Sequence, residues 1–155
     1  VIGSTTGYSQ PIMERLIPVV HANGYAPDYL VTPDHVPSGR PAPWMCYLNA
    51  MQLDVYPLSH MVKIGDSVID MQEGRNAGMW TVGVIRSGNE VGLTMDGEAS
   101  CRNAELRARW SAASERLMAG GAHYTIKHWG EIWDVLEQID ARIANGEVPS
   151  VPTAH

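Results

Sequence analysis

Two aspartates four residues apart, Asp66 and Asp70, are the residues of this chain whose spacing best suits a metal ion. An apolar run over residues 61–64 ends in Gly65-Asp66, and a helical pattern opens near Ser67. This pattern predicts a buried strand with Asp66 at its carboxyl end and Asp70 on the same side of the following helix. Hard oxygen ligands in such a place suit a divalent cation such as Mg2+. The alternative is structural, with Asp66 as a helix cap and Asp70 as an ordinary first-turn acid.

A hydroxyl-rich turn lies near the start of the chain. Residues 1–3 predict a strand that runs into Ser4-Thr5-Thr6-Gly7-Tyr8, and a helix over about 9–23 follows. Thr5 or Thr6, together with the backbone N–H groups at that helix start, would suit a bound phosphate. A capped turn without any ligand explains the same residues equally well.

Arg40 is the third group with a chemical use. It stands in Gly39-Arg40-Pro41-Ala42-Pro43-Trp44, where rigid neighbours restrict the backbone just before a predicted helix. A planar guanidinium held in this way suits bidentate binding of phosphate. The alternative is a surface arginine that is solvated or paired with Asp34.

These groups need a scaffold, and the alternation of strands and helices predicts an open parallel sheet. In such a sheet the carboxyl ends of the strands share one edge, where ligands bind. A hydroxyl, an arginine and two carboxylates at that edge describe a site for a phosphoryl group, although no nucleophile is evident. We predict a loop over 86–98 and four apolar helix faces. The predicted strands are 1–3, 29–31, 61–64, 80–85 and 124–126, and the predicted helices are 9–23, 43–53, 68–77, 103–119 and 131–144. The predicted buried faces are Ile12, Leu16, Val19 and Val20 in the first helix; Trp44, Tyr47, Leu48 and Met51 in the second; Leu106, Trp110, Ala113 and Leu117 in the fourth; and Ile132, Leu136, Ile139 and Ile143 in the fifth.

Composition narrows the class of protein. The 155 residues are 45% hydrophobic and 18% charged, which fits one globular domain. A net charge of −6 argues against nucleic acid as the main partner. Cys46 and Cys101 have no metal-binding spacing and favour a reduced, cytoplasmic setting. The chain has no apolar run of the roughly 20 residues that cross a membrane.

The order of these motifs resembles motifs two to four of the haloacid-dehalogenase superfamily. More closely, IGSTTGY, VTPDHVPSGRPAPWMCY and KIGDSVIDMQEGRNAGMWTVGVI resemble the phosphonoacetaldehyde hydrolase family, as does the later GAHYTI. The GRPAPWM segment is specific, because relatives outside that family usually carry lysine at motif three. The resemblance implies an α/β, three-layer, Rossmann-like haloacid-dehalogenase core with a parallel sheet.

The resemblance also implies a reaction, the Mg2+-dependent cleavage of the C–P bond of phosphonoacetaldehyde to acetaldehyde and phosphate. By position, Thr6 would hydrogen-bond the transferring phosphoryl group and Arg40 would clamp it. Asp66 would bind Mg2+, and Asp70 would orient the water shell of the metal. Thr5 and Tyr8 are further candidates for contact with the substrate. The implied partner is a small phosphonate, and the full-length enzyme would form a homodimer.

Two features of the family find no match in this chain. The first motif, DxAGTxxD, carries the aspartate nucleophile, and a small helical cap carries the lysine that forms a Schiff base. The only lysines here are Lys63 and Lys127, and neither matches that position. We therefore expect residues 1–145 to be the C-terminal part of the core domain, with an interrupted sheet, and residues 146–155 to be a flexible tail.

Two functions follow from this expectation. In the first, the chain supplies the phosphate- and Mg2+-binding half of a phosphonatase site and is inactive alone. In the second, it is a non-catalytic fragment that binds phosphate or Mg2+, or serves a structural role with a complementary chain.

Overall fold

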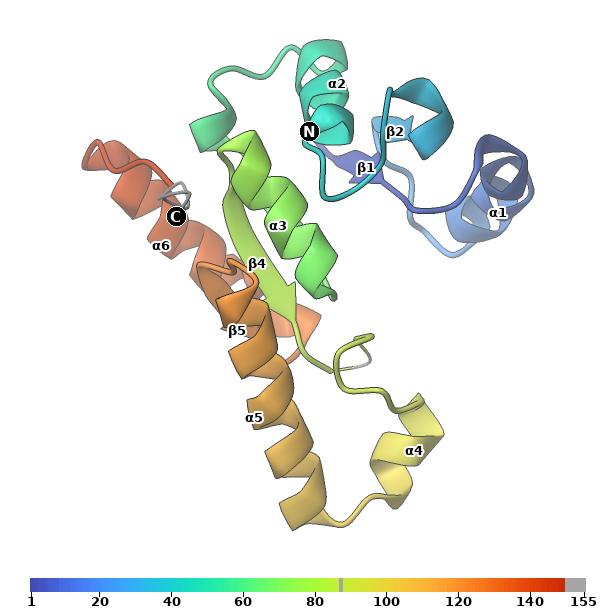
Figure 1. Cartoon of the computed structure of the whole chain (residues 1–155), viewed down its shortest axis with the longest axis vertical. Helices are drawn as coiled ribbons and strands as arrows, with labels where there is room; N and C mark the ends of the chain where they lie inside the picture. The colour runs from blue at the N-terminus through green and yellow to red at the C-terminus, as the bar shows by residue number, and fades with distance from the viewer. Residues whose placement is uncertain (87, 150–155) are drawn as a thin grey trace.

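The computed structural model describes residues 1–86 and 88–149. Strands and helices alternate along these residues (Figure 1). The elements are β1 (Gly3–Thr5), α1 (Gln10–Ala22), β2 (Tyr29–Val31), η1 (Pro33–His35), α2 (Trp44–Gln52), η2 (Leu58–His60), β3 (Val62–Gly65), α3 (Val68–Ala77), β4 (Trp80–Val84), α4 (Met95–Ser100), α5 (Asn103–Ala119), β5 (Tyr124–Ile126), η3 (Trp129–Glu131) and α6 (Ile132–Ala144).

All described strand pairs are parallel, but they form two sheets. Strands β3, β4 and β5 form one sheet in that order, and β1 pairs only with β2. The predicted parallel α/β architecture is therefore confirmed, including an interruption between the strand of the first turn and the strand of Asp66. No backbone ladder joins β1 to β3 within the described residues.

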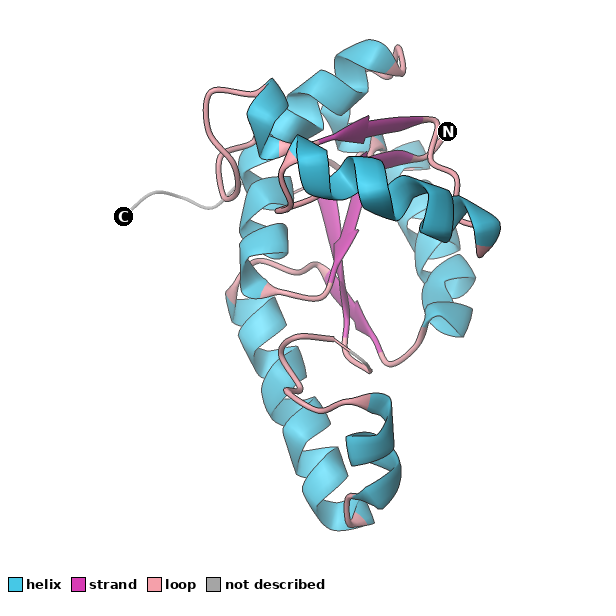
Figure 2. Ribbon diagram, turned by 90° about the vertical axis from the view of Figure 1, so that its right-hand side faces the viewer, coloured by secondary structure: helices cyan, strands magenta, loops and turns pink. Residues whose placement is uncertain are grey.

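The three-stranded sheet is the middle layer of three (Figure 2). Trp80 and Val82 of β4 face α6, where they pack with Ile139. Gly83 faces the opposite side, and a Cβ placed there would lie 3.0 Å from the Leu117 side chain of α5. Because side chains alternate along a strand, the fully buried β4 turns Trp80, Val82 and Val84 toward α6, and its small Thr81 and Gly83 let the helices of the opposite layer approach closely.

Helix α3 carries Asp70 and follows the prediction closely. It spans Val68–Ala77 and ends at Gly78, whose φ of +76° is the left-handed conformation that a glycine cap adopts without strain. Its Gly74 lies against Lys63 of β3, because a Cβ at that position would be 2.7 Å from the Lys63 Cβ. This close approach fixes the helix over the strand that precedes it.

The two-stranded sheet packs on α2. Asn49 of α2 donates to the Ser4 carbonyl oxygen across 3.1 Å. A Cβ at Gly3 would lie 2.6 Å from the Asn49 Oδ1. Glycine at this position therefore lets the helix approach the strand.

Helix α1 stands apart from the other helices (Figure 1). An open cavity of about 440 Å³ lies between α1 and the β1–β2 unit. The predicted buried face of α1 is wrong at two positions, because Ile12 is 45% and Val19 is 56% exposed, while Met13 is buried. The described residues cover α1 along one narrow stripe only.

Two other predictions need correction. Helix α2 buries Met45, Cys46 and Ala50, whereas Trp44 and Met51, from the predicted face, are exposed. The region predicted as a loop over 86–98 contains the start of α4, whose Thr94 cap accepts a hydrogen bond from the Gly97 amide. None of the described helices combines the length and apolar character that crossing a membrane requires.

The predicted tail is only partly described. Glu147 pairs with Arg142 across 2.8 Å, and Pro149 is buried. Gly146, Glu147 and Val148 are exposed, so a flexible tail remains a prediction. The remainder of the predicted tail, residues 150–155, lies outside the described residues.

Candidate functional site

Arg40 and Asp70 form an ion pair at the start of α3. The Arg40 Nη1 donates to the Asp70 Oδ1, and the two side chains are 23% and 7% exposed. Asp34, the alternative partner considered for Arg40, instead accepts a hydrogen bond from the Gln10 amide across 2.5 Å. The structure thus places the arginine of the predicted third motif directly against the second aspartate of the predicted fourth.

Two glycines make room for this pair. A Cβ at Gly65 would collide with Asp70, and a Cβ at Gly7 would lie 2.5 Å from the Arg40 Nη2. Gly7 belongs to the turn that contains Thr6 and Tyr8, so the guanidinium lies between this turn and α3. The predicted meeting of the three motifs at the carboxyl ends of β1 and β3 is what the structure shows.

Asp70 is held in its ionised form. Burial raises the pKa of its carboxyl group, but a hydrogen bond from Ser67 and the positive charges of Lys63 and Arg40 outweigh that effect and lower the pKa. The Ser67 Oγ donates to the Asp70 Oδ2 across 2.5 Å. The Lys63 Nζ lies 3.7 Å from the Asp70 Oδ1. The carboxylate is therefore surrounded by donors and stays anionic.

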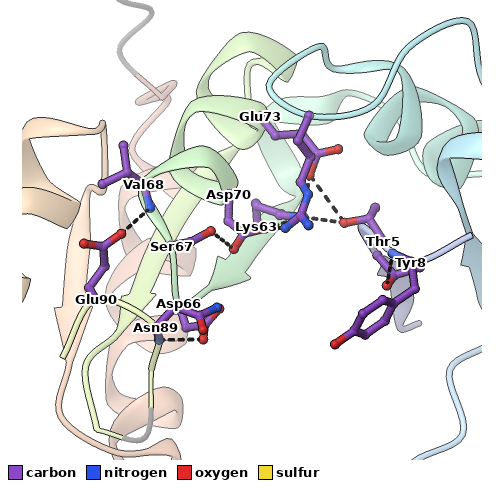
Figure 3. A network of polar contacts seen from close by, with 12 residues as sticks. Thr5, Tyr8, Lys63, Asp66, Ser67, Val68, Asp70, Glu73, Asn89 and Glu90 are labelled. Atoms are coloured by element: carbon purple, nitrogen blue, oxygen red, sulfur yellow. Dashed lines mark hydrogen bonds and ion pairs between the residues drawn. The ribbon is translucent and has the colours of Figure 1, made fainter. Parts of the chain in front are cut away.

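A buried ion pair between Lys63 and Glu73 lies next to Asp70 and was not predicted. The Lys63 Nζ donates to the Glu73 Oε2 across 2.6 Å and to the Thr5 Oγ1 across 2.5 Å. Glu73 is fully buried and Lys63 is 8% exposed. Figure 3 shows the lysine between Asp70 of α3 and Thr5 of β1. The available signal was a lysine inside an apolar strand, followed ten positions later by a glutamate on the next helix.

Thr5 and Thr6 face different surroundings. The Thr5 hydroxyl is engaged by Lys63, and its oxygen also lies 3.4 Å from the Glu73 Oε2. The Thr6 Oγ1 accepts from the Tyr8 amide across 3.1 Å, and Tyr8 is 56% exposed. Contact of Thr5, Thr6 or Tyr8 with a substrate remains a prediction.

Asp66 lies at the end of β3 and is partly exposed. Its Oδ2 accepts from the Asn89 amide across 2.9 Å, in the loop that follows β4 (Figure 3). The next loop residue, Glu90, accepts from the Val68 amide across 3.2 Å and pairs with Arg116. The loop is thus fastened over the first turn of α3, beside Asp66.

The residues that could bind a divalent cation are the carboxylates of Asp66 and Asp70. Asp66 and Asp70 supply the hard oxygen ligands that Mg2+ prefers, and Asp66 is the more accessible of the two. Asp70 is already neutralised by Arg40, which suits it better to orienting bound water than to direct ligation. Within residues 1–86 and 88–149, no three His, Cys, Asp or Glu side chains gather into a complete cation site. The donor set fits one part of a magnesium site.

Comparisons with known proteins agree with the motifs. The phosphonoacetaldehyde hydrolase of Nitratidesulfovibrio vulgaris is 51% identical over 148 residues, covering 96% of this chain and 53% of that protein. The phosphonoacetaldehyde hydrolase of Bacillus cytotoxicus is 54% identical over 139 residues, covering 90% of this chain and 53% of that protein. No family model matches.

Solved structures show the same fold. A phosphonoacetaldehyde hydrolase-like protein from Oleispira antarctica superposes with a TM-score of 0.91 at 35% identity, over 95% of this chain and 53% of that one. A haloacid-dehalogenase family hydrolase from Deinococcus radiodurans, solved with bound phosphate and sodium, has a TM-score of 0.60 at 20% identity, over 88% of this chain and 51% of that one. The chain spans about half the length of the curated relatives it matches. Over nearly its whole length it is a homologue of the phosphonoacetaldehyde hydrolases with a haloacid-dehalogenase fold.

Proposed function

We propose that this chain supplies the phosphate- and magnesium-binding half of a phosphonoacetaldehyde hydrolase site. The reaction cleaves the C–P bond with water and gives acetaldehyde and phosphate. The observation that carries the proposal is the position of Arg40, which lies between the Thr6–Tyr8 turn and Asp70 at the carboxyl ends of β1 and β3. The names of the relatives at 51% and 54% identity give the reaction class.

The roles of this chain's residues follow from their contacts. One nitrogen of the Arg40 guanidinium is held by Asp70, so the remaining N–H groups are directed toward phosphoryl oxygens rather than left to rotate. The Thr6 hydroxyl and the Gly7 amide lie on the other side of the guanidinium and would donate to the same group, whereas the Thr6 and Tyr8 amides already donate to the Val31 carbonyl and the Thr6 hydroxyl. The exposed Tyr8 ring is a further candidate for contact with the substrate.

The magnesium ion belongs beside Asp66. When bound there, Mg2+ would neutralise charge on the phosphoryl group. Asp66 would hold it directly, and Asp70 would orient its water shell. The carboxylate of Asp70 remains ionised for that task because Ser67, Lys63 and Arg40 lower its pKa.

The remaining chemistry requires groups that these residues do not supply. The family reaction uses an aspartate nucleophile and a lysine imine, and the imine withdraws electrons so that the carbon can leave phosphorus and take a proton. Lys63 is buried in an ion pair, and Lys127 follows β5 at the far edge of the three-stranded sheet. We therefore infer that the nucleophile and the imine come from a complementary segment. The interruption between β1 and β3 supports this inference, because an extended segment there would join both sheets.

The test is complementation. We would express the part of the Nitratidesulfovibrio vulgaris enzyme that this chain does not match, mix it with this chain and Mg2+, and follow acetaldehyde release from phosphonoacetaldehyde. We expect no turnover from either piece and measurable turnover from the mixture, lost when this chain carries Asp66→Ala. Turnover by this chain alone would overturn the assignment of roles.

A second function is favoured by one observation. Both carboxylates of the candidate site already accept hydrogen bonds, Asp70 from Ser67 and Arg40, and Asp66 from the Asn89 amide. A non-catalytic chain that binds phosphate or Mg2+ would look the same. Saturable phosphate binding without any turnover in the complemented mixture would favour this second function. The first function requires a small phosphonate in addition to the complementary segment and Mg2+. Dimerisation and a cytoplasmic setting remain predictions.

A further inference from the structure

We propose that Lys63 is a positioning residue, which holds the phosphate-binding turn in place by anchoring the Thr5 hydroxyl across the interruption between β1 and β3. This proposal rests on the proposed function, since it assigns a cause to the geometry of that same site. It also gives Thr5 a role different from that of its neighbour Thr6, namely anchoring rather than substrate contact.

The contacts of the lysine fit an anchor. Its Nζ donates to the Thr5 Oγ1 across 2.5 Å and to the Glu73 Oε2 across 2.6 Å, and it lies 3.7 Å from Asp70 (Figure 3). The lysine belongs to β3, Thr5 belongs to β1, and Glu73 belongs to α3. One ammonium group therefore connects three elements directly behind the Arg40–Asp70 pair.

The chemistry of the three groups fixes the direction of the hydrogen bonds. An ammonium can only donate, so the Thr5 oxygen must accept from Lys63. The Thr5 proton then points toward the Glu73 carboxylate, whose Oε2 lies 3.4 Å from the Thr5 oxygen. The Thr5 hydroxyl therefore accepts from one buried partner and donates to the other. Because successive side chains of a strand alternate in direction, Thr6 points to the opposite side from Thr5.

The anchor matters because, among the described residues, no backbone hydrogen bond joins these two strands. Between β1 and β3 the described residues share no backbone ladder, and Lys63–Thr5 is the hydrogen bond that links them. The turn that touches Arg40 begins at the residue after Thr5. A displacement of Thr5 would therefore move the Thr6–Tyr8 amides relative to the guanidinium.

The experiment is a phosphate titration of the whole chain, with amide chemical shifts of Gly7 and Tyr8 as the readout. Thr5→Val removes the hydroxyl and leaves the buried charges untouched, and Thr5→Ser is the matched control that keeps it. We expect Thr5→Val to weaken phosphate binding by about fivefold to tenfold, which corresponds to one ordinary hydrogen bond, and Thr5→Ser to restore it. A merely structural role would lower the stability of Thr5→Val without a change in phosphate affinity at temperatures where it is folded.

A double-variant cycle with Lys63→Met separates anchoring from direct contact. If Lys63 acts through Thr5, the second substitution adds little to the affinity lost through the first. Additive losses would mean that Thr5 touches phosphate itself, and the proposal would be overturned. If Lys63→Met does not fold, hydrogen exchange of the Thr6 amide in the phosphate-free chain decides instead, since anchoring predicts faster exchange in Thr5→Val than in Thr5→Ser and direct contact with phosphate predicts equal exchange.

Failure of the proposed function would look different. Absence of any saturable shift with inorganic phosphate in the unaltered chain would reject the phosphate site. The anchoring claim would then be judged by hydrogen exchange of the Thr6 amide, which donates to the Val31 carbonyl across 3.2 Å. Faster exchange in Thr5→Val than in Thr5→Ser supports the anchor, and equal exchange rejects it.

Discussion

The buried pair of Lys63 and Glu73 offers the sharpest test of how this chain is held together. Glu73 is fully buried, and its Oε2 accepts a hydrogen bond from Lys63 across 2.6 Å. Lys63→Met keeps most of the apolar stem but leaves the glutamate buried, with the Thr5 hydroxyl at 3.4 Å as its one remaining side-chain donor among the described residues. Stranding one partner of a buried pair costs about 3–5 kcal/mol of the free energy of unfolding. That loss is a large share of the roughly 5–15 kcal/mol that stabilises a typical domain.

The double variant Lys63→Met with Glu73→Leu removes both charges. Because well-packed apolar groups can replace a buried pair at little cost, we expect it to recover to within about 1 kcal/mol of the unaltered chain. Urea unfolding followed by circular dichroism measures both values. Arg109→Met is the control, since its pair with Glu105 is exposed and should contribute about 0.3–0.5 kcal/mol. A single variant as stable as this control, or a double variant worse than the single one, would refute the reasoning.

Four other predictions follow from individual residues. Burial, and then nearby arginine charges, lower the pKa of His123 from 6.5 to about 4. Its contribution to stability is therefore complete above pH 6.5 and is lost as the pH falls from 6.5 toward 4. In His123→Gln the urea midpoint should depend less on pH over that range. Arg40→Lys should weaken phosphate binding about tenfold in titration calorimetry, because the bidentate fork is lost; unchanged affinity would reject its role. Gly65→Ala should cost about 1–3 kcal/mol in urea unfolding, since its methyl group meets Asp70. Burial raises the pKa of the Cys46 thiol to about 12, so native Cys46 should resist iodoacetamide at pH 8 and react only after unfolding.

Much of the scaffold was predictable because its signals are local. Helix α3 begins after Ser67 and ends at Gly78 as predicted, since the left-handed glycine closes the helix without reference to the rest of the chain. Ser67 precedes the first turn, but its hydroxyl donates to Asp70 and not to a free amide of the helix start. The strands around it are short apolar runs between such caps. The interruption of the sheet was also predictable, although only through the resemblance to a family with a further strand.

The faces of two helices were mispredicted for a physical reason. In α2 the larger side chains, Trp44 and Met51, have the spacing of a buried stripe, but the helix buries Cys46, Asn49 and Ala50 instead. Asn49 bonds to Ser4, and the small Ala50 permits close approach to the strand. Spacing alone does not separate two adjacent stripes when one is made of small and polar residues that a neighbour requires.

The residues of the site were predicted, but the contacts between them were not. Arg40 and Asp70 were both identified, yet the sequence offered no reason to join them, because they lie thirty residues apart in different motifs. Lys63 was considered only as a poor match for an imine-forming lysine. Its partner could not be predicted because a buried cation selects whichever carboxylate the tertiary fold brings near it.

The side-chain contacts that form the site also join the two sheets. Between residues 1–53 and 61–149, the described hydrogen bonds all use side chains, with Arg40–Asp70 and Lys63–Thr5 at the centre. A ligand that binds Arg40 therefore also tightens the contact between the two units. By linkage, a phosphate concentration one hundred times the Kd would stabilise the folded chain by about 2.7 kcal/mol. Since that energy acts at the junction, it should be felt first in the β1–β2 unit, which has no backbone ladder to hold it against β3.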